Sequence, residues 1–595
     1  MERTLTKCSS LRRYRSFSAC SMISCTTSYN YMHDSIKRCN FYCPNMTLGI
    51  HISNTKIEKK VLLWQNIFYS NKIILLREDF MKQLWKKLDV ASFLTAIYAG
   101  IVCLFYFYSY VTQKASLNVL FFFFVLCFFY FLFLPISKKL NQMEGFHGQV
   151  LSRNKKILTF ALVSVLTFLF LMIWFIAYYP GAFSEDSINQ YTQAITGNYN
   201  DWHPVWHTLL FFTLPLKLFG KPSAIILLQI LYFSLLIGYM ALTICELWNI
   251  KAAFFSVVYI VMNPYTCVIL LFPWKDVAFG MGALLCTILS VQLALKEKVP
   301  SKNWKLLLLG VFISSTTVFR HNAILFTAAL LIALFFWIDK KSWIKILLFS
   351  CVSLFIIKIP IYHILNVEKP DQRVIETAGL PLTVIGNVAK ETPYLMDDKL
   401  SDFVYTMASP EQWANNYNCG NFNSIKWSGI NTSIVEEEGR LGMLKLMFKC
   451  FHLSTNASLQ ATFALTDIVY GFETGLKGDV QPYIADSSLY EIHYPPTHNQ
   501  SLLDFISAYT RFIDTTVFKY LRTYGITLLV ILFITLSRMH FKSWISWKKT
   551  FFALPIFLYD FGTMFLLTGP DSRFFYVTFL VAPLIITFTM HKKEE

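Results

Sequence analysis

The chain has 595 residues, of which 55% are hydrophobic and only 15% are charged. This composition argues against a water-soluble globule, because too little polar surface remains to cover so large an apolar core. The formal net charge of +17 would suit nucleic acid, but Lys and Arg fall in short clusters between apolar runs, as topology signals do. We therefore expect an all-α polytopic membrane protein with no nucleic-acid partner.

Residues 1–88 are rich in Ser, Cys and Arg and contain no apolar run long enough to span a bilayer or to serve as a cleavable signal. They are predicted to form a cytoplasmic N-terminal extension. From residue 89 on, about twelve stretches approach the length of a transmembrane helix. These stretches are 90–111, 117–136, 157–177, 223–247, 252–272, 277–295, 305–319, 323–338, 343–365, 519–536, 550–567 and 574–590.

Basic connections alternate along the chain and predict that both termini are cytoplasmic. Segment 208–220 is short and contains Pro215, so it is expected to be an interfacial helix within an acidic outer loop, 178–222. Nine spans then occupy 89–365, and the last three occupy 519–595 with a cytoplasmic tail. Between them, 366–518 is predicted to be an extracytoplasmic region of mixed structure. A Cys419–Cys450 disulfide is one option there if the compartment is oxidising.

The outer loop carries Glu185 and Asp186 in the run YYPGAFSEDS, and it continues without a Lys or Arg through residue 210. A carboxylate in a partly desolvated pocket has a raised pKa and can take a proton from a substrate hydroxyl. Asp186 is the main candidate for this role. The alternative is that Ser184, Glu185 and Asp186 only cap a helix that runs on from Ser187. The sequence leaves both interpretations open.

Farther along this loop, His203 and His207 are four residues apart, which is acceptable metal-ligand spacing on a helix. Pro204 fits the first turn of a helix capped by Asp201. Without a third ligand nearby, the two histidines are instead expected to pack or to bind substrate. The thirteen Cys residues show no metal-binding spacing.

Three turns on the predicted outer face carry cations, although topology keeps that face poor in Lys and Arg. Grouped cations against apolar surroundings suit a phosphate group. The alternative is that each cation is a boundary residue that reaches toward water. The turns are PWKD with Lys275 and Asp276, FRHN with Arg320 and His321, and GPDSR with Asp571 and Arg573.

Two ionisable residues fall within predicted spans, where an unpaired charge is costly. Lys358 lies near the outer end of its span and can reach the interface. Asp560 lies near the middle of its span and is expected to pair with a basic group or to line a cavity.

The motifs Y-P-G-x-F-S-x-D-S, D-W-H-P, P-W-K-D, F-R-H-N and P-D-S-R-F resemble those of multi-pass proteins of Gram-positive bacteria related to the GT-C class of glycosyltransferases. That class includes the protein mannosyltransferases and the lipid A aminoarabinose transferase. The resemblance is architectural over 155–365 and 519–590, and at motif level it rests on S-E-D-S at 184–187. It implies Asp186 as the catalytic carboxylate, with Lys275, Arg320 and Arg573 near a donor phosphate. Some members carry a spaced acidic pair, which this chain lacks, so a divalent cation stays an open option.

The leading hypothesis is a glycosyltransferase of the plasma membrane that uses a polyprenyl-phosphate sugar and an extracytoplasmic acceptor. Asp186, with Glu185 beside it, would act on the acceptor hydroxyl, and His203, His321 and the cations would bind the donor. Supporting roles fall to Asp201, His207, Asp276, Asp560 and Asp571. The alternative is a transporter or flippase of a lipid-linked or anionic solute, which predicts functional charges near the midplane.

Overall fold

The computed structural model describes residues 89–108, 115–295, 303–370, 374–470, 482–485, 492–494, 499–539 and 544–592. The predicted cytoplasmic extension, 1–88, lies outside them. Within the described part of the chain all regular elements are helices, and other backbone pairing is limited to isolated bridges. The prediction of an all-α protein is therefore confirmed for these residues.

Among the described residues, six helical segments are long and apolar enough to cross a membrane, judged by length and composition alone. They comprise α6 (Ala115–Gln142), α7 (Arg153–Ala177), α11 (Pro222–Leu247), α14 (Lys275–Ala294), α17 (Lys340–Ile356) with η2 (Ile357–Ile361) and α18 (Tyr362–Ile364), and η5 (Ser572–Phe575) with α29 (Tyr576–Met590). Other helices lie at the remaining predicted spans. These are α5 (Val90–Tyr108), α12 (Ile250–Val261), α15 (Asn303–Val318), α16 (Ile324–Phe335), α26 (Tyr524–Ser537), and α28 (Leu554–Met564), which follows α27 (Trp544–Thr550). The count of about twelve spans and the side of each terminus stay predictions.

The predicted span 252–272 is not one continuous helix. It is divided into α12 and α13 (Pro264–Ile269), and the Asn263 side chain accepts a hydrogen bond from the backbone N–H of Tyr265. Proline supplies no backbone N–H and restricts the residue before it to extended conformations. Asn263 is extended, and a new helix begins at Pro264.

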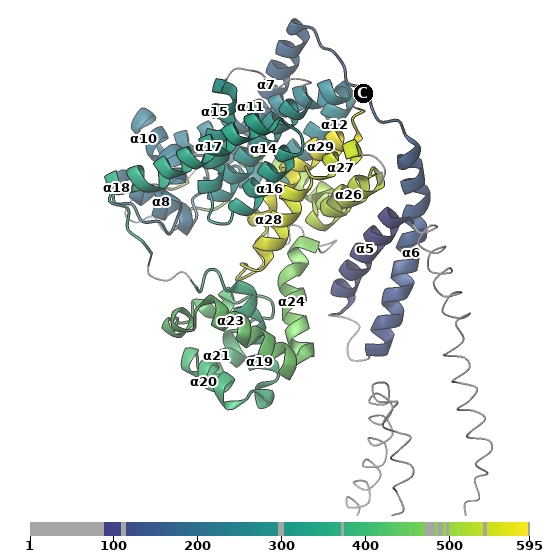
Figure 1. Ribbon diagram of the computed structural model, residues 1–595. Coiled ribbons are helices and arrows are strands. Elements are labelled where there is room, and N and C mark those ends of the chain that lie inside the picture. Colours follow the sequence, from purple (N-terminus) through teal and green to yellow (C-terminus); the bar gives the residue numbers. More distant parts are fainter. Residues whose placement is uncertain are drawn as a thin grey trace, which may run out of the picture. The chain divides into compact units, whose positions relative to one another are not determined.

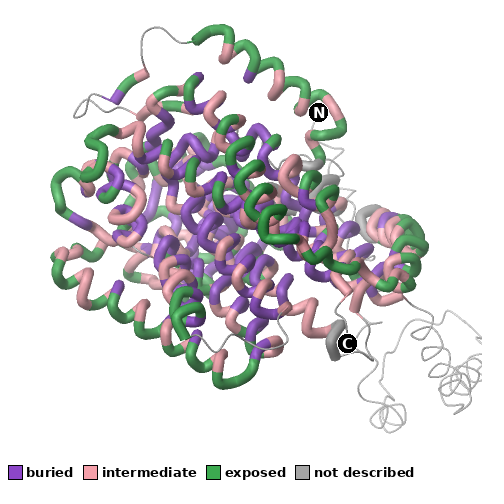
Figure 2. Tube along the Cα trace, turned by 90° about the horizontal axis from the view of Figure 1, so that it is seen from above, coloured by how far each residue is buried: buried purple, intermediate pink, exposed green. Residues whose placement is uncertain are grey.

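Helices α14 and α29 lie at the centre of the helical bundle (Figure 1). In their most apolar windows 83% of the residues are buried, against 11% for α6 and 17% for the α17 segment. Figure 2 shows exposed residues along the outer helices and buried residues between them. The outer helices expose large apolar side chains such as Phe124, Leu166 and Phe355, as a lipid-facing surface does.

Gly280 brings α14 and α29 close together. A Cβ atom at this position would lie 3.1 Å from Leu580 Cδ1 and 3.4 Å from Tyr576 Cδ1, so with a larger residue here these two side chains would have to shift by a few tenths of an ångström. This close packing fixes the beginning of α14, with Lys275 and Asp276, near the η5 turn that carries Arg573.

The prediction of mixed structure for 366–518 is wrong for the residues that the structure describes there, which form helices joined by loops. In α20, Leu400, Phe403, Val404 and Met407 are buried at helical spacing, a period that the Gly, Pro and Asn residues around these short elements obscured. Cys419 and Cys450 are both free thiols. The helices are α19 (Gly379–Glu391), η3 (Pro393–Leu395), α20 (Asp398–Met407), α21 (Pro410–Asn416), α22 (Asn423–Lys426), α23 (Ser433–Leu453), α24 (Thr455–Tyr470), α25 (Gln500–Thr515) and η4 (Val517–Arg522).

The acidic outer loop is helical over much of its length. It contains α8 (Glu185–Thr196), α9 (Val205–His207), η1 (Thr208–Thr213) and α10 (Leu214–Phe219). Gly220 ends α10 in the left-handed conformation, with φ of 66°. Segment 208–220 thus contains the expected helix, and its interfacial position stays a prediction.

Candidate functional site

Asp186 is the second residue of α8. Ser184 is the N-cap of this helix, and its hydroxyl accepts hydrogen bonds from the backbone N–H of Ser187 at 3.4 Å and from Trp274 Nε1 at 2.7 Å. The helix dipole favours a carboxylate in this first turn. The capping interpretation is therefore right for Ser184, and it leaves the Asp186 side chain available for other contacts.

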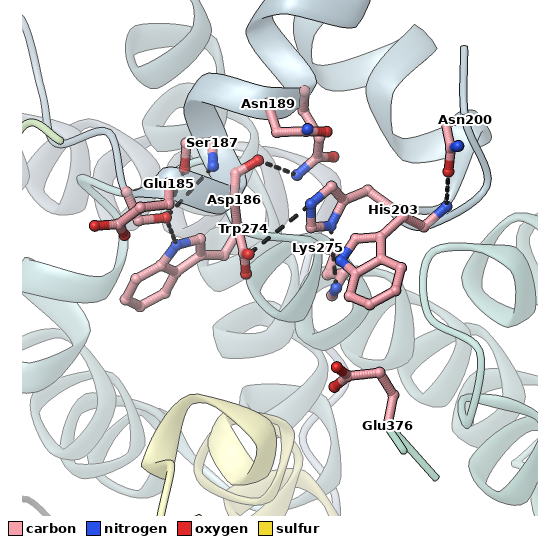
Figure 3. Close-up of polar contacts among 12 residues, drawn as sticks. Glu185, Asp186, Ser187, Asn189, Asn200, His203, Trp274, Lys275 and Glu376 are labelled. Carbon is pink, nitrogen blue, oxygen red and sulfur yellow. Dashed lines mark hydrogen bonds and ion pairs between the residues drawn. The ribbon is translucent and has the colours of Figure 1, made fainter. Parts of the chain in front are cut away.

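The Asp186 carboxylate lies among basic side chains (Figure 3). Its Oδ2 atom is 3.1 Å from Arg573 Nη1, and its Oδ1 atom is 3.8 Å from His203 Nε2. The neighbouring Glu185 instead accepts a hydrogen bond from the Tyr483 hydroxyl at 2.9 Å. The two adjacent carboxylates therefore have different surroundings, and only Asp186 contacts the cations.

Arg573 joins residues from three segments of the chain. Its Nε atom is 2.8 Å from Asp571 and 3.7 Å from Asp276, while Nη1 reaches Asp186. The guanidinium carbon lies 4.8 Å from the centre of the Trp274 ring. A planar guanidinium suits this site because it can bind several oxygens and stack on an aromatic ring.

Arg320 lies in the turn between α15 and α16 and forms an ion pair with the buried Asp276. Its Nε atom donates to Asn322 Oδ1 at 2.6 Å, and its guanidinium lies 4.0 Å from the Phe574 ring centre. Asn322 in turn donates to Thr563 of α28 at 2.7 Å. The structure thus brings together the three cation-bearing turns, which are far apart in sequence.

Lys275 and His203 form the other side of this cluster. The Lys275 Nζ atom lies 3.2 Å from His203 Nδ1. Burial, reinforced by the charge of Lys275, lowers the pKa of His203 to about 3, so the imidazole is neutral and can accept a hydrogen bond from the lysine.

The pKa of Asp186 is lowered, which makes the expectation of a raised pKa wrong. Burial opposes ionisation of this carboxyl, but the positive charges of Arg573 and Lys275 outweigh burial and hold its pKa well below the usual range. The sequence places these cations far from Asp186 along the chain, so their effect follows only from the fold.

A cavity of about 570 Å³ opens beside the cluster. Lys275, Arg320 and His321 line it from the helical bundle, together with Trp202. Asp186 is not among its lining residues; its side chain is 33% exposed and is linked to the cavity through His203 and Lys275. The opposite wall comes from Glu376, Thr377 and Arg440. Figure 3 shows the Glu376 carboxylate turned toward the cluster.

An apolar groove of about 430 Å³ lies nearby, between η1, α10, α11, α14 and α15. Phe319 lines this groove, and the next residue, Arg320, lines the polar cavity. The apolar groove and the polar cavity are therefore adjacent at this turn.

His207 packs in the interior, as one of the two interpretations expected, whereas Asp201 does not have the predicted role. His207 Nδ1 lies 2.7 Å from Gln190 Oε1. His203 lies before the first residue of α9, so the two histidines do not lie on one face of a helix. The two histidines therefore do not form a metal pair. Asp201 does not cap α9 but accepts hydrogen bonds from Lys358 and Tyr362. Among the described residues no group of three His, Cys, Asp or Glu side chains is arranged to hold a metal ion.

Asp560 is fully buried and accepts a hydrogen bond from the Thr578 hydroxyl at 2.7 Å. No basic side chain of the described residues pairs with it, and it lines none of the cavities above. The expectation that it pairs with a basic group is therefore wrong, and a cavity at Asp560 stays a prediction. A neutral hydroxyl partner in a tightly packed interior takes the place of a counter-ion.

Several residues of this site were not predicted from the sequence, among them Trp202, Trp274, Glu376, Thr377 and Arg440. Trp274 stands inside the PWKD motif, where its position beside Lys275 was a usable signal. Glu376, Thr377 and Arg440 lie in the region of weak periodicity, and only the fold brings them to the cavity.

The comparisons with known proteins give a structural similarity but no match in sequence. No family model matches the chain, and no curated protein matches it in sequence. Among solved structures, that of ArnT from Cupriavidus metallidurans bound to undecaprenyl phosphate matches 73% of this chain and 78% of ArnT, with 12% identity and a TM-score of 0.28.

Proposed function

We propose that this chain is a membrane glycosyltransferase of the GT-C type, which moves a sugar from a polyprenyl-phosphate donor to an extracytoplasmic acceptor at the plasma membrane. The observation that carries the proposal is the 3.1 Å contact of Asp186 with Arg573, beside Lys275 and near Arg320. Displacement at a sugar phosphate needs one group to take a proton and others to stabilise the departing phosphate.

In the proposed reaction an acceptor hydroxyl attacks the anomeric carbon of the donor sugar. The bond from that carbon to the phosphate oxygen breaks, and its electron pair leaves with the polyprenyl phosphate. The hydroxyl proton passes to the Asp186 carboxylate, while Arg573, Lys275 and Arg320 stabilise the phosphate charge.

The lowered pKa of Asp186 makes this carboxylate a weak base before the donor binds. The cations that lower the pKa are the same groups that a donor phosphate would contact. An anionic phosphate beside Arg573 and Lys275 offsets their charge, so the pKa of Asp186 rises when the donor is present. Proton acceptance is thereby linked to donor binding.

The adjacent groove and cavity support a lipid-linked donor. An isoprenoid chain fits a groove lined by side chains such as Leu214, Leu285 and Phe319, because burial of apolar surface favours binding. The phosphate and sugar would then reach the cavity past Arg320. Glu376, Thr377 and Arg440 on the opposite wall are our candidates for acceptor recognition.

A divalent cation is disfavoured at Asp186, because Arg573 and Lys275 already supply positive charge there. We therefore propose a metal-independent reaction. The test incubates membranes enriched in the chain with labelled polyprenyl-phosphate sugars, with and without EDTA. Label should leave the lipid at equal rates in both samples. Labelled lipid that crosses the bilayer with its sugar intact would instead support the rival function, a transporter or flippase.

A further inference from the structure

Lys358 carries a charge on a helix that faces largely outward. Helix α17 continues into the π-helical segment η2, which contains Pro360, and neighbouring residues such as Ile356 and Ile359 are exposed. Proline interrupts regular helical hydrogen bonding, and π-helical turns occur often at functional sites. A charged residue in such an apolar helix is costly unless it has partners.

Lys358 has such partners: its Nζ atom donates to the Tyr362 hydroxyl at 2.8 Å and to Asp201 Oδ2 at 3.3 Å. The Tyr362 hydroxyl donates to Asp201 Oδ1 at 2.8 Å. Both oxygens of the Asp201 carboxylate are therefore bound by the outer end of one membrane helix. We name these three residues the Asp201 anchor.

The backbone around Asp201 is held as well. Its N–H donates to the carbonyl of Glu368 at 2.9 Å, and the Glu368 N–H donates to the carbonyl of Tyr199 at 2.9 Å. The next two residues, Trp202 and His203, reach the site: Trp202 lines the cavity, and His203 contacts Lys275 and Asp186. The anchor thus fixes the loop directly before the site residues.

We propose that Lys358 and Tyr362 are positioning residues, which act through Asp201 to hold Trp202 and His203 against Lys275 and Asp186. The reaction that they assist rests on the proposed function. Misplacement of reacting groups by about 1 Å lowers rates about 100-fold. Arg573 and Arg320, which would bind the donor phosphate, are held by other contacts, so loss of the anchor should affect kcat more than KM.

The first test measures hydrogen exchange of the purified full chain in detergent. Lys358→Met should increase exchange in residues 197–204, whereas Lys345→Met should not. Lys345 is a matched control because it is exposed on the same helix and donates to Asn303 at 2.9 Å. Lys358→Arg should restore protection. Unchanged exchange in Lys358→Met, or equal exchange in both Met variants, would overturn the inference.

The second test measures transfer from a labelled polyprenyl-phosphate sugar. Lys358→Met and Tyr362→Phe should lower kcat about 10-fold to 100-fold and change the donor KM less than about threefold. Lys358→Arg should recover most of the rate. If loop exchange rises but kcat is unchanged, the positioning role is wrong. If the wild type transfers no sugar, the proposed function fails, and the exchange experiment still decides whether the anchor holds the loop.

Discussion

Replacement of Arg573 by Lys tests whether a planar guanidinium, rather than positive charge alone, is needed at the site. Arg573 reaches Asp186 at 3.1 Å and Asp571 at 2.8 Å, and it stacks 4.8 Å from the Trp274 ring. A lysine keeps the charge but cannot make these contacts together. Loss of one preorganised donor to a transition-state oxygen costs about 2.7–4 kcal/mol. Because charge is retained, we expect Arg573→Lys to raise the activation free energy by less, about 1.4–2.7 kcal/mol. This corresponds to a 10-fold to 100-fold fall in kcat/KM.

The assay is release of label from a polyprenyl-phosphate sugar by purified protein, with kcat and KM determined separately. Arg511→Lys provides the control, since Arg511 is exposed on α25 and outside the site. Thermal unfolding in detergent checks that both variants are folded. If folded Arg573→Lys kept more than half of the wild-type kcat/KM, our account of the guanidinium would be refuted.

Other predictions concern stability, pH and donor length. Arg320→Gln leaves the buried Asp276 without its nearest cation and should cost about 3–5 kcal/mol of stability; a lower unfolding temperature, largely restored by adding Asp276→Asn, would bear this out. Burial lowers the pKa of His203 to about 3. Below pH 6.5 this imidazole therefore binds fewer protons in the folded protein than in the unfolded protein. The free energy of unfolding should fall by up to about 1.4 kcal/mol for each pH unit below pH 6.5. His203→Gln should lessen that fall, which is measured by comparing the unfolding midpoints of the two proteins at pH 7 and pH 5. Ser315→Trp should fill part of the apolar groove and raise KM for a long polyprenyl donor more than for a short-chain donor; equal effects on both would contradict a lipid site there.

Much of the helical architecture could be predicted from apolar runs, because lipid-facing helices need long stretches without charge. The broken helix at Asn263 shows where hydropathy alone fails, since apolar residues continue across a Pro-Tyr sequence that begins a new helix. In 366–518 several helices, such as α20, α21 and α22, are short, and turn residues around them hid the helical spacing of their apolar residues. Composition therefore predicted the long apolar helices better than it predicted the helices of 366–518.

At the site, the motif residues could be predicted individually, but their pairing could not. Lys275, Arg320 and Arg573 were each recognised from charge on the predicted outer face. That Arg573 contacts Asp186 depends on the fold, which brings the first turn of α8 to the η5 turn far later in the chain. The pKa of Asp186 was therefore predicted with the wrong sign, because burial was visible in the sequence whereas the neighbouring cations were not.

The most direct test of the account is sugar transfer by purified Asp186→Asn, compared with Asp402→Asn. Asp402 is exposed on α20 and provides the same carboxylate-to-amide change away from the site. With labelled polyprenyl-phosphate sugar and acceptor, Asp402→Asn should match the wild type. Asp186→Asn should bind the donor but lower kcat at least about 100-fold, the low end of what general-base catalysis contributes. Wild-type kcat in folded Asp186→Asn would contradict the role of Asp186 as the base.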